Sequence, residues 1–84
     1  MAYRAPLLIR EAMTAAGLSL RELARRSGLP VGTMGMTMTG KRPLPLLAVH
    51  KVATALGMKP AAARRLALAA IEDHGGVEIV ELLR

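Results

Sequence analysis

Glycine and proline divide this 84-residue chain into short segments, and each segment carries the apolar spacing of an α-helix. Pro6 and Pro60 suit the first turn of a helix, where the N–H that proline lacks would have no partner. Gly17, Gly28 and Gly57 each come directly after a segment with helical apolar spacing, the position of a glycine that ends a helix. These positions predict an all-α fold built from short helices.

Apolar residues recur three and four positions apart within five segments. Ser19 precedes the second segment and Glu22 follows three residues later, a spacing typical of a capping box. In the fourth segment, Leu46 and Val49 are expected on one inner face with Ala53. The expected helices cover residues 6–16, 20–27, 31–39, 46–56 and 60–74.

The amino-acid composition limits the core and the chemistry available to the chain. One Tyr and no Phe or Trp leave aliphatic side chains and methionine to build the core of one small domain. The absence of cysteine excludes disulfides and thiolate metal sites. His50 and His74 lie far apart with no cluster of ligands around them, so no metal and no other cofactor is expected.

Potential catalytic side chains gather at one place only, the run Glu72, Asp73 and His74. Consecutive residues of a helix point in different directions, so three neighbours in sequence do not converge on one substrate. We interpret the run as a solvated helix end. No catalytic residues and no enzymatic activity are therefore expected.

Basic residues are concentrated in the first three quarters of the chain. Residues 1–65 contain 11 of the 12 lysines and arginines and only two acidic residues, whereas residues 66–84 contain four acidic residues and Arg84. The formal net charge is +6 and the pI is about 11.2. This distribution favours a polyanion such as nucleic acid as the partner, the alternative being arginine-rich helix faces that are simply solvated.

The C-terminal sequence "VEIVELLR" has a different pattern, with five apolar residues in eight. Its β-branched start favours a strand, whereas its spacing also fits a helix. Either element needs a covering surface, which a second copy of the chain could provide. We therefore expect a domain at residues 1–74 and an extension at residues 75–84 that forms a dimer. The candidate dimerisation residues are Val77, Ile79, Val80, Leu82 and Leu83.

The sequence predicts neither a membrane-spanning segment nor an export signal. No apolar run approaches the roughly 20 residues that span a membrane. The N-terminal residues lack the long apolar segment and the cleavage site of a signal peptide. A cytoplasmic location in a bacterial cell or a phage-infected host is therefore expected, with no membrane partner.

The second and third expected helices have the spacing of a helix-turn-helix. In "LRELARRSGLPVGTMGMTMTGKRP", Ala24 is small enough for two helices to approach, Gly28 suits the turn, and Met34 can pack the second helix onto the first. With "AGLSLRELARRSGL", "GKRP" and a helix ending in "ALGM", the chain resembles the phage Cro and repressor family (XRE-type helix-turn-helix domains) over residues 7–71. The resemblance implies a five-helix DNA-binding domain; an unrelated small helical bundle is the alternative.

The resemblance also implies that the helix at residues 31–39 enters the major groove of DNA. The family usually has Gln at the position of Leu20 and polar readers near Pro30, Gly35 and Met36, so this sequence departs from the pattern. Readout without charge is possible, because a Thr hydroxyl donates or accepts and Thr, Val and Met can contact thymine methyl groups. The candidate base-reading residues are Val31, Gly32, Thr33, Gly35, Met36 and Thr39.

Basic residues beside this helix are expected to contact DNA phosphates. The sequence "GKR" follows the helix directly, as in the family, and further arginines lie in the second helix. Such contacts supply most of the non-specific affinity of DNA-binding proteins. The candidate phosphate-contacting residues are Arg21, Arg25, Arg26, Lys41, Arg42 and Lys51.

Two methionines replace an ion pair that many members of the family have between the first and third helices. The family's Arg aligns with Met13 and its Glu aligns with Met38. Apolar side chains of similar reach can replace a buried ion pair without loss of stability. We therefore expect the third helix to dock on the first, with Met34 and Met38 facing the core.

The sequence thus predicts a small, sequence-specific, repressor-like transcriptional regulator that binds double-stranded operator DNA as a homodimer. Half-sites about 34 Å apart are expected for such a dimer. The alternative is a protein-interaction module with the same fold, because Val31, Met36 and the glycines also suit an adaptable protein contact. Its partner would be RNA polymerase, another regulator or a toxin. A third possibility is architectural DNA binding without sequence preference.

Overall fold

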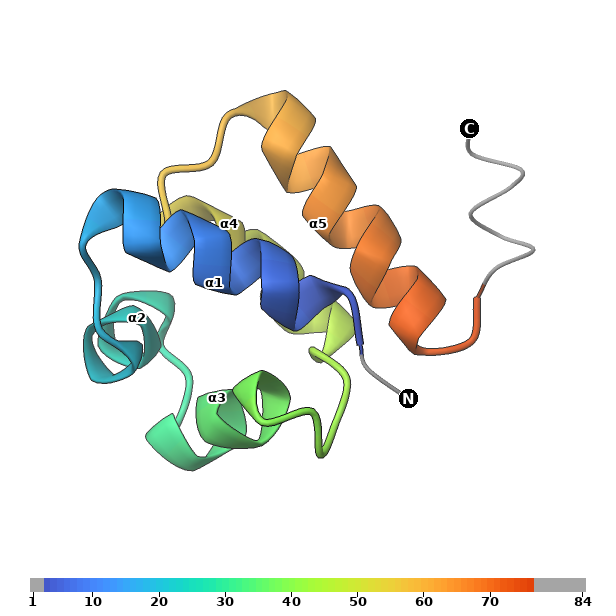
Figure 1. The fold of residues 1–84 in the computed structure, drawn as a ribbon, viewed down its shortest axis with the longest axis horizontal. Coiled ribbons are helices and arrows are strands. Elements are labelled where there is room, and N and C mark those ends of the chain that lie inside the picture. Colours follow the sequence, from blue (N-terminus) through green and yellow to red (C-terminus); the bar gives the residue numbers. More distant parts are fainter. Residues whose placement is uncertain (1–2, 77–84) are drawn as a thin grey trace.

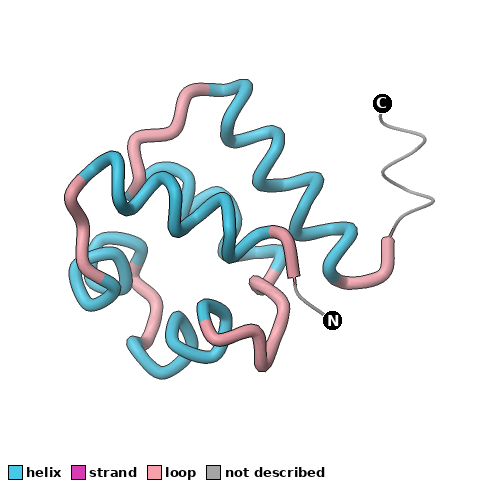
Figure 2. The backbone as a smooth tube through the Cα atoms, viewed as in Figure 1, coloured by secondary structure: helices cyan, strands magenta, loops and turns pink. Residues whose placement is uncertain are grey.

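The computed structural model describes residues 3–76, which form five α-helices and one short 3₁₀ helix and contain no strand (Figures 1 and 2). The all-α prediction is confirmed. The candidate dimerisation residues, and with them the choice between strand and helix, lie outside the described residues. None of the described helices is both long and apolar enough to cross a membrane. The elements are α1 (Ala5–Ala16), α2 (Leu20–Ser27), α3 (Val31–Met38), η1 (Leu46–Ala48), α4 (Val49–Ala55) and α5 (Pro60–Asp73).

The connection between α2 and α3 has the geometry that the helix-turn-helix spacing predicted. Gly28 follows α2 with φ of 72°, a left-handed conformation that glycine adopts without steric cost. The N–H of Leu29 then donates to the carbonyl oxygen of Ala24 at 3.1 Å, which closes the end of α2. Pro30 is extended and precedes the first residue of α3. The turn therefore directs α3 away from the axis of α2 (Figure 1).

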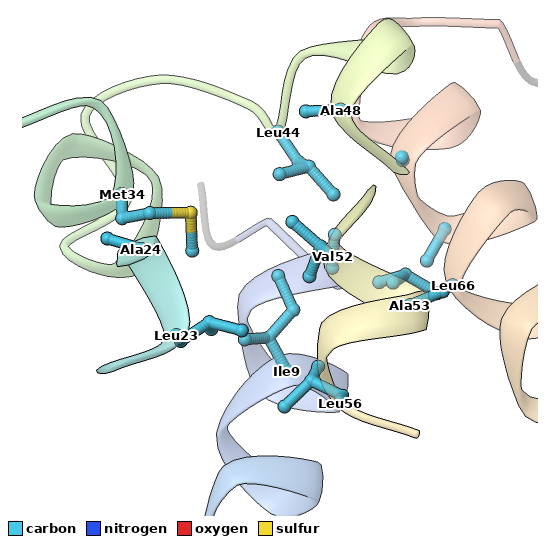
Figure 3. Packing of buried hydrophobic residues seen from close by; sticks show 13 residues of the cluster. Ile9, Leu23, Ala24, Met34, Leu44, Ala48, Val52, Ala53, Leu56 and Leu66 are labelled. Carbon is cyan, nitrogen blue, oxygen red and sulfur yellow. The ribbon is translucent and has the colours of Figure 1, made fainter. Parts of the chain in front are cut away.

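The core is shared by all five α-helices (Figure 3). Met34 is fully buried and points from α3 toward Ala24 of α2, so the predicted packing of these two residues is confirmed. α2 also packs on α4, and α5 packs on both α1 and α4. The fully buried aliphatic residues that these helices contribute are Ile9 from α1, Leu23 from α2, Val52 from α4 and Leu66 from α5.

The segment before α4 differs from its prediction. Leu46, expected on an inner face, is 47% exposed, and Leu47 is 94% exposed. Leu44 is fully buried instead. Pro45 holds the chain extended with ψ of 131°, and the α-helix begins only at Val49 after the 3₁₀ turn. Because α4 begins later than predicted, Leu46 does not lie on its buried face.

Glu22 completes only half of the predicted capping box. The Ser19 hydroxyl oxygen accepts the N–H of Glu22 at 3.1 Å, so Ser19 caps α2 as expected. The Glu22 carboxylate does not return to the Ser19 N–H. It binds the guanidinium groups of Arg25 and Arg26, which are one turn further along the same helix.

α3 packs on α2 and α1, which confirms the predicted docking of the third helix on the first. Met13 and Met38 are both half-buried against the core. Arg10, one turn before Met13, forms a hydrogen bond between α1 and α3. Its Nη2 donates to the Met38 carbonyl oxygen at 3.3 Å. Carbonyl groups in the last turn of a helix have no partner within the helix, which makes this oxygen available to a cation.

The last turn of α5 caps the beginning of α1. The Asp73 carboxylate accepts the N–H groups of Arg4 at 2.8 Å and Ala5 at 2.9 Å. The first N–H groups of a helix have no intrahelical partner, and Arg4 provides no side-chain cap of its own. A carboxylate at this end also suits the helix dipole. Asp73 therefore fixes α1 to α5, whose ends lie side by side in Figure 1.

The residues beside Asp73 are also engaged with other parts of the fold. Glu72 forms an ion pair with Arg4 at 3.4 Å. His74 Nε2 lies 2.8 Å from the carbonyl oxygen of Leu44, so the tautomer protonated at Nε2 donates to it. The interpretation of this run as a solvated helix end was wrong. Its partners lie 30 to 69 positions away in the sequence, where local patterns give no signal.

Asp73→Ala is expected to destabilise the protein by about 1–2 kcal/mol, the usual effect of removing a helix cap. Urea unfolding at neutral pH measures the change. The control is Glu11→Ala, which removes an exposed carboxylate from the middle of α1 and should shift stability by less than about 0.5 kcal/mol. Equal stability of Asp73→Ala and the wild type would show that the cap contributes nothing.

Candidate nucleic-acid interface

One side of α3 is exposed to solvent along the helix. Met34 and Thr37 point to the opposite side and are buried. Val31 and Met36 are 47% and 42% exposed, so two large apolar side chains lie on this side of the helix. At 100° per residue, the exposed side forms a continuous arc. This arc, called here the α3 face, consists of the half-buried Gly35 and the exposed residues Val31, Gly32, Met36 and Thr39.

The polar groups of the α3 face are few. The Thr39 hydroxyl donates to the carbonyl oxygen of Gly35 at 2.8 Å and lies 3.3 Å from that of Met36. Its proton is therefore used within the helix, and only its lone pairs remain for a partner. Thr33 is half-buried at the border of the face, in a shallow pocket that Met36 and Arg42 also line. The six predicted base-reading residues thus form one continuous, largely apolar surface.

Gly32 and Gly35 are not required by the packing of the domain. A Cβ atom built on either residue would meet no atom within 4 Å. Neither has a positive φ. Each glycine makes a helix about 1 kcal/mol less stable than alanine would. Their effect on the surface is to expose the backbone of α3 between Val31 and Met36, so that a partner can approach it closely.

Two basic residues, Lys41 and Arg42, are hydrogen-bonded through their backbone N–H groups to the end of α3. Gly40 turns the chain with φ of 78°, and the N–H groups of Lys41 and Arg42 then donate to the carbonyl oxygen of Met36 at 2.9 and 3.3 Å. Both side chains are exposed. The backbone positions of these two charges are therefore fixed relative to the α3 face. A partner that binds both cations is thereby held near Met36.

The arginines of α2 carry less available charge than the sequence indicated. Glu22 binds Arg25 at 3.2 Å and Arg26 at 3.0 Å. The hydrogen bonds from Arg25 and then Arg26 lower the pKa of Glu22 to about 2. One carboxylate thus offsets part of the charge of two predicted phosphate-contacting residues. Arg21, one turn before Arg25, is exposed on the first turn of α2.

The pKa of Glu22 leads to a pH prediction. Because the folded pKa lies below the ordinary value of 4.5, the ion pairs add stability above about pH 4.5, and this contribution is lost as the pH falls toward about 2. Glu22→Gln should therefore be less stable than the wild type at pH 7 and equally stable near pH 2. Urea unfolding of both proteins at pH 7, 4 and 2 measures the difference. A difference that stays constant over this range would contradict the assignment.

For two basic residues, Lys51 and Arg10, the structure differs from the expected set of phosphate contacts. Lys51 is exposed on α4, which packs mainly on α2 and α5. Arg10, which was not predicted, lies at the end of the α3 face and lines a shallow hollow with Tyr3, Thr39 and Gly40. No local sequence pattern indicates this role of Arg10, because the resemblance placed the link between the first and third helices at Met13. Arg10 is thus a further candidate for contact with a polyanion.

The comparisons with known proteins identify the turn and the helices around it. A family model described as a helix-turn-helix domain matches residues 7–67. The match runs from α1 into α5 and includes α3 and the cations that follow it. It agrees with the resemblance to the Cro and repressor family. Neither a curated protein nor a solved structure shows a significant match to the chain.

Proposed function

Since this chain belongs to the helix-turn-helix domain family, we propose that it is a transcriptional regulator that binds double-stranded DNA in a sequence-specific manner through α3. The observation that carries the proposal is the exposed α3 face, with Lys41 and Arg42 hydrogen-bonded through their backbone to Met36 at its end. This arrangement places a surface that can lie in a DNA groove beside positive charges that can bind the adjacent phosphates. Both are needed to read a sequence in register.

The dimensions of α3 suit the major groove. An α-helix with its side chains is about 10–12 Å in diameter, and the major groove is about 12 Å wide and accepts one α-helix. Lys41 and Arg42 would bind phosphates at one end of α3, and Arg21 on α2 is the candidate for a second phosphate contact. Arg25 and Arg26 contribute less in this account, because Glu22 already binds both.

A dimeric repressor is the form of regulator that we favour. Two copies related by a two-fold axis would place two α3 helices in successive major grooves, about 34 Å apart. The support for dimerisation is the apolar sequence at residues 77–83, outside the described structure. A dimer bound over a promoter would block transcription by occupying it. The operator would then be a palindrome with half-sites one helical turn apart.

The second candidate function is a protein-interaction module, favoured by the exposure of Val31 and Met36. Duplex binding and sequence preference of the wild type, measured together with the variant Met36→Glu, separate the two functions. In a DNA reader, the new carboxylate faces phosphates, and binding to a duplex enriched by the wild type should fall about 100-fold or more, equivalent to about 3 kcal/mol. A wild-type protein that binds no duplex at low salt would favour the protein partner. A wild type that binds all duplexes equally would favour architectural binding.

A further inference from the structure

We propose that the α3 face recognises DNA mainly through the 5-methyl groups of thymine, so that its preferred sites place T·A pairs against Val31 and Met36. This inference rests on the proposed function and specifies the ligand chemistry of the same surface. It follows from the groups that the face contains and from those that it lacks.

The α3 face cannot make the side-chain hydrogen bonds that usually identify purines. Guanine is recognised by paired donors from Arg or Lys, and adenine by the amide of Asn or Gln. The α3 face has none of these side chains. Its one hydroxyl, on Thr39, donates its proton to the Gly35 carbonyl oxygen at 2.8 Å. The other hydroxyl of α3 near the face belongs to Thr33, which is half-buried at its border and lines the pocket beside Arg42.

The apolar groups of the face fit the one apolar feature of the major groove. The thymine methyl group projects into that groove, and aliphatic side chains contact it favourably. Val31 and Met36 are the large exposed side chains of α3. They lie five residues apart, about 7.5 Å along the helix axis. They are also about 140° apart around the axis, at the two edges of the α3 face, so each side chain is placed to contact the methyl group of a different base pair.

Gly32 and Gly35 bring the face close enough for such contacts. A methyl contact requires carbon atoms within about 4 Å of each other, a shorter reach than that of a long polar side chain. The open space at both glycines leaves no Cβ between the helix backbone and the floor of the groove. Arg42, which lines a pocket with Met36, can bind a phosphate while Met36 reaches a base. The depth of insertion is then set by backbone contacts and the specificity by methyl groups.

Replacement of thymine by uracil tests the proposal, because it removes the methyl group and leaves every hydrogen-bonding group of the base pair in place. The probe is a duplex enriched by the wild-type protein from a random pool, resynthesised with deoxyuridine at one thymine at a time. At each contacted thymine, affinity should fall about fourfold, the equivalent of about 0.8 kcal/mol for one buried methyl group. At thymines outside the contact, affinity should not change.

Two protein variants assign the effect to the α3 face. Met36→Ala should bind the thymine and uracil duplexes with equal affinity at one position and keep the wild-type ratio at the others. Arg42→Ala should bind all duplexes more weakly and keep every thymine-to-uracil ratio. Selective duplex binding with no uracil effect at any thymine would overturn this inference while leaving the proposed function intact. Absence of duplex binding would overturn both.

Discussion

Replacing Lys41 and Arg42 together with alanine is expected to weaken binding to duplex DNA about 60-fold at about 0.1 M salt. Each phosphate contact contributes about 0.9 to the slope of log affinity against log salt, so two contacts account for about 60-fold between 0.1 and 1 M salt. Both side chains are exposed beside the α3 face, and their N–H groups are bound to the Met36 carbonyl oxygen. The slope of log affinity against log salt should therefore be smaller in magnitude by about 1.8 in the double variant.

A matched control removes the same charges from another part of the domain. Lys59 lies immediately before α5 and Arg65 lies in its first half, and both are exposed. In Figure 1, α5 lies on the opposite side of α1 from α3. The double variant Lys59→Ala with Arg65→Ala should bind within about threefold of the wild type, since screened charges far from the contact add little. Equal losses in the two double variants would show that net charge alone governs binding. An unchanged affinity of the Lys41 and Arg42 variant would place DNA elsewhere on the protein.

Replacing Gly32 and Gly35 together with alanine is expected to stabilise the free protein and weaken its complex with DNA. Alanine is favoured over glycine by about 1 kcal/mol at each helix position, so the free energy of unfolding should rise by up to about 2 kcal/mol. The open space around both residues means that the new methyl groups meet nothing within the domain. In the complex, however, they would occupy space that the DNA needs. Affinity should fall at least about fivefold, since overpacking costs about 1–3 kcal/mol.

The opposite signs of the two effects make this variant informative. Thermal unfolding and DNA titration are measured on the same preparation. Thr14→Ala, at an exposed helical position of α1, is the control for improved helix propensity and should leave DNA affinity unchanged. Stabilisation without loss of affinity would show that the α3 face makes no close contact with DNA. Destabilisation would show that the glycines serve the fold itself.

Features of the fold that depend on neighbouring residues could be predicted from the sequence. The turn at Gly28 and the packing of Met34 on Ala24 follow from spacing within a few turns, and the structure confirms them. The burial of Leu44 was not predictable, because it depends on how an extended segment crosses the domain. The cap that Asp73 provides for α1 joins residues 69 positions apart, for which periodicity carries no information.

The candidate site was predictable in outline, and its electrostatics were not. The resemblance placed the candidate readers on α3, and helical periodicity predicted that Met34 and Met38 face the core. The pairing of Glu22 with Arg25 and Arg26 uses spacings of three and four, so the sequence contained its signal. The role of Arg10 required the structure, since its partner is a backbone carbonyl of another helix.

The most direct test of the central claim, sequence-specific DNA recognition by the α3 face, is selection of duplexes from a random pool at about 50 and 200 mM salt. We expect enrichment of one palindromic sequence with half-sites one helical turn apart and thymines within each half-site. Affinity for it should fall steeply between the two salt concentrations, because phosphate contacts depend on salt. Failure to enrich any sequence, or binding that salt does not affect, would contradict the claim.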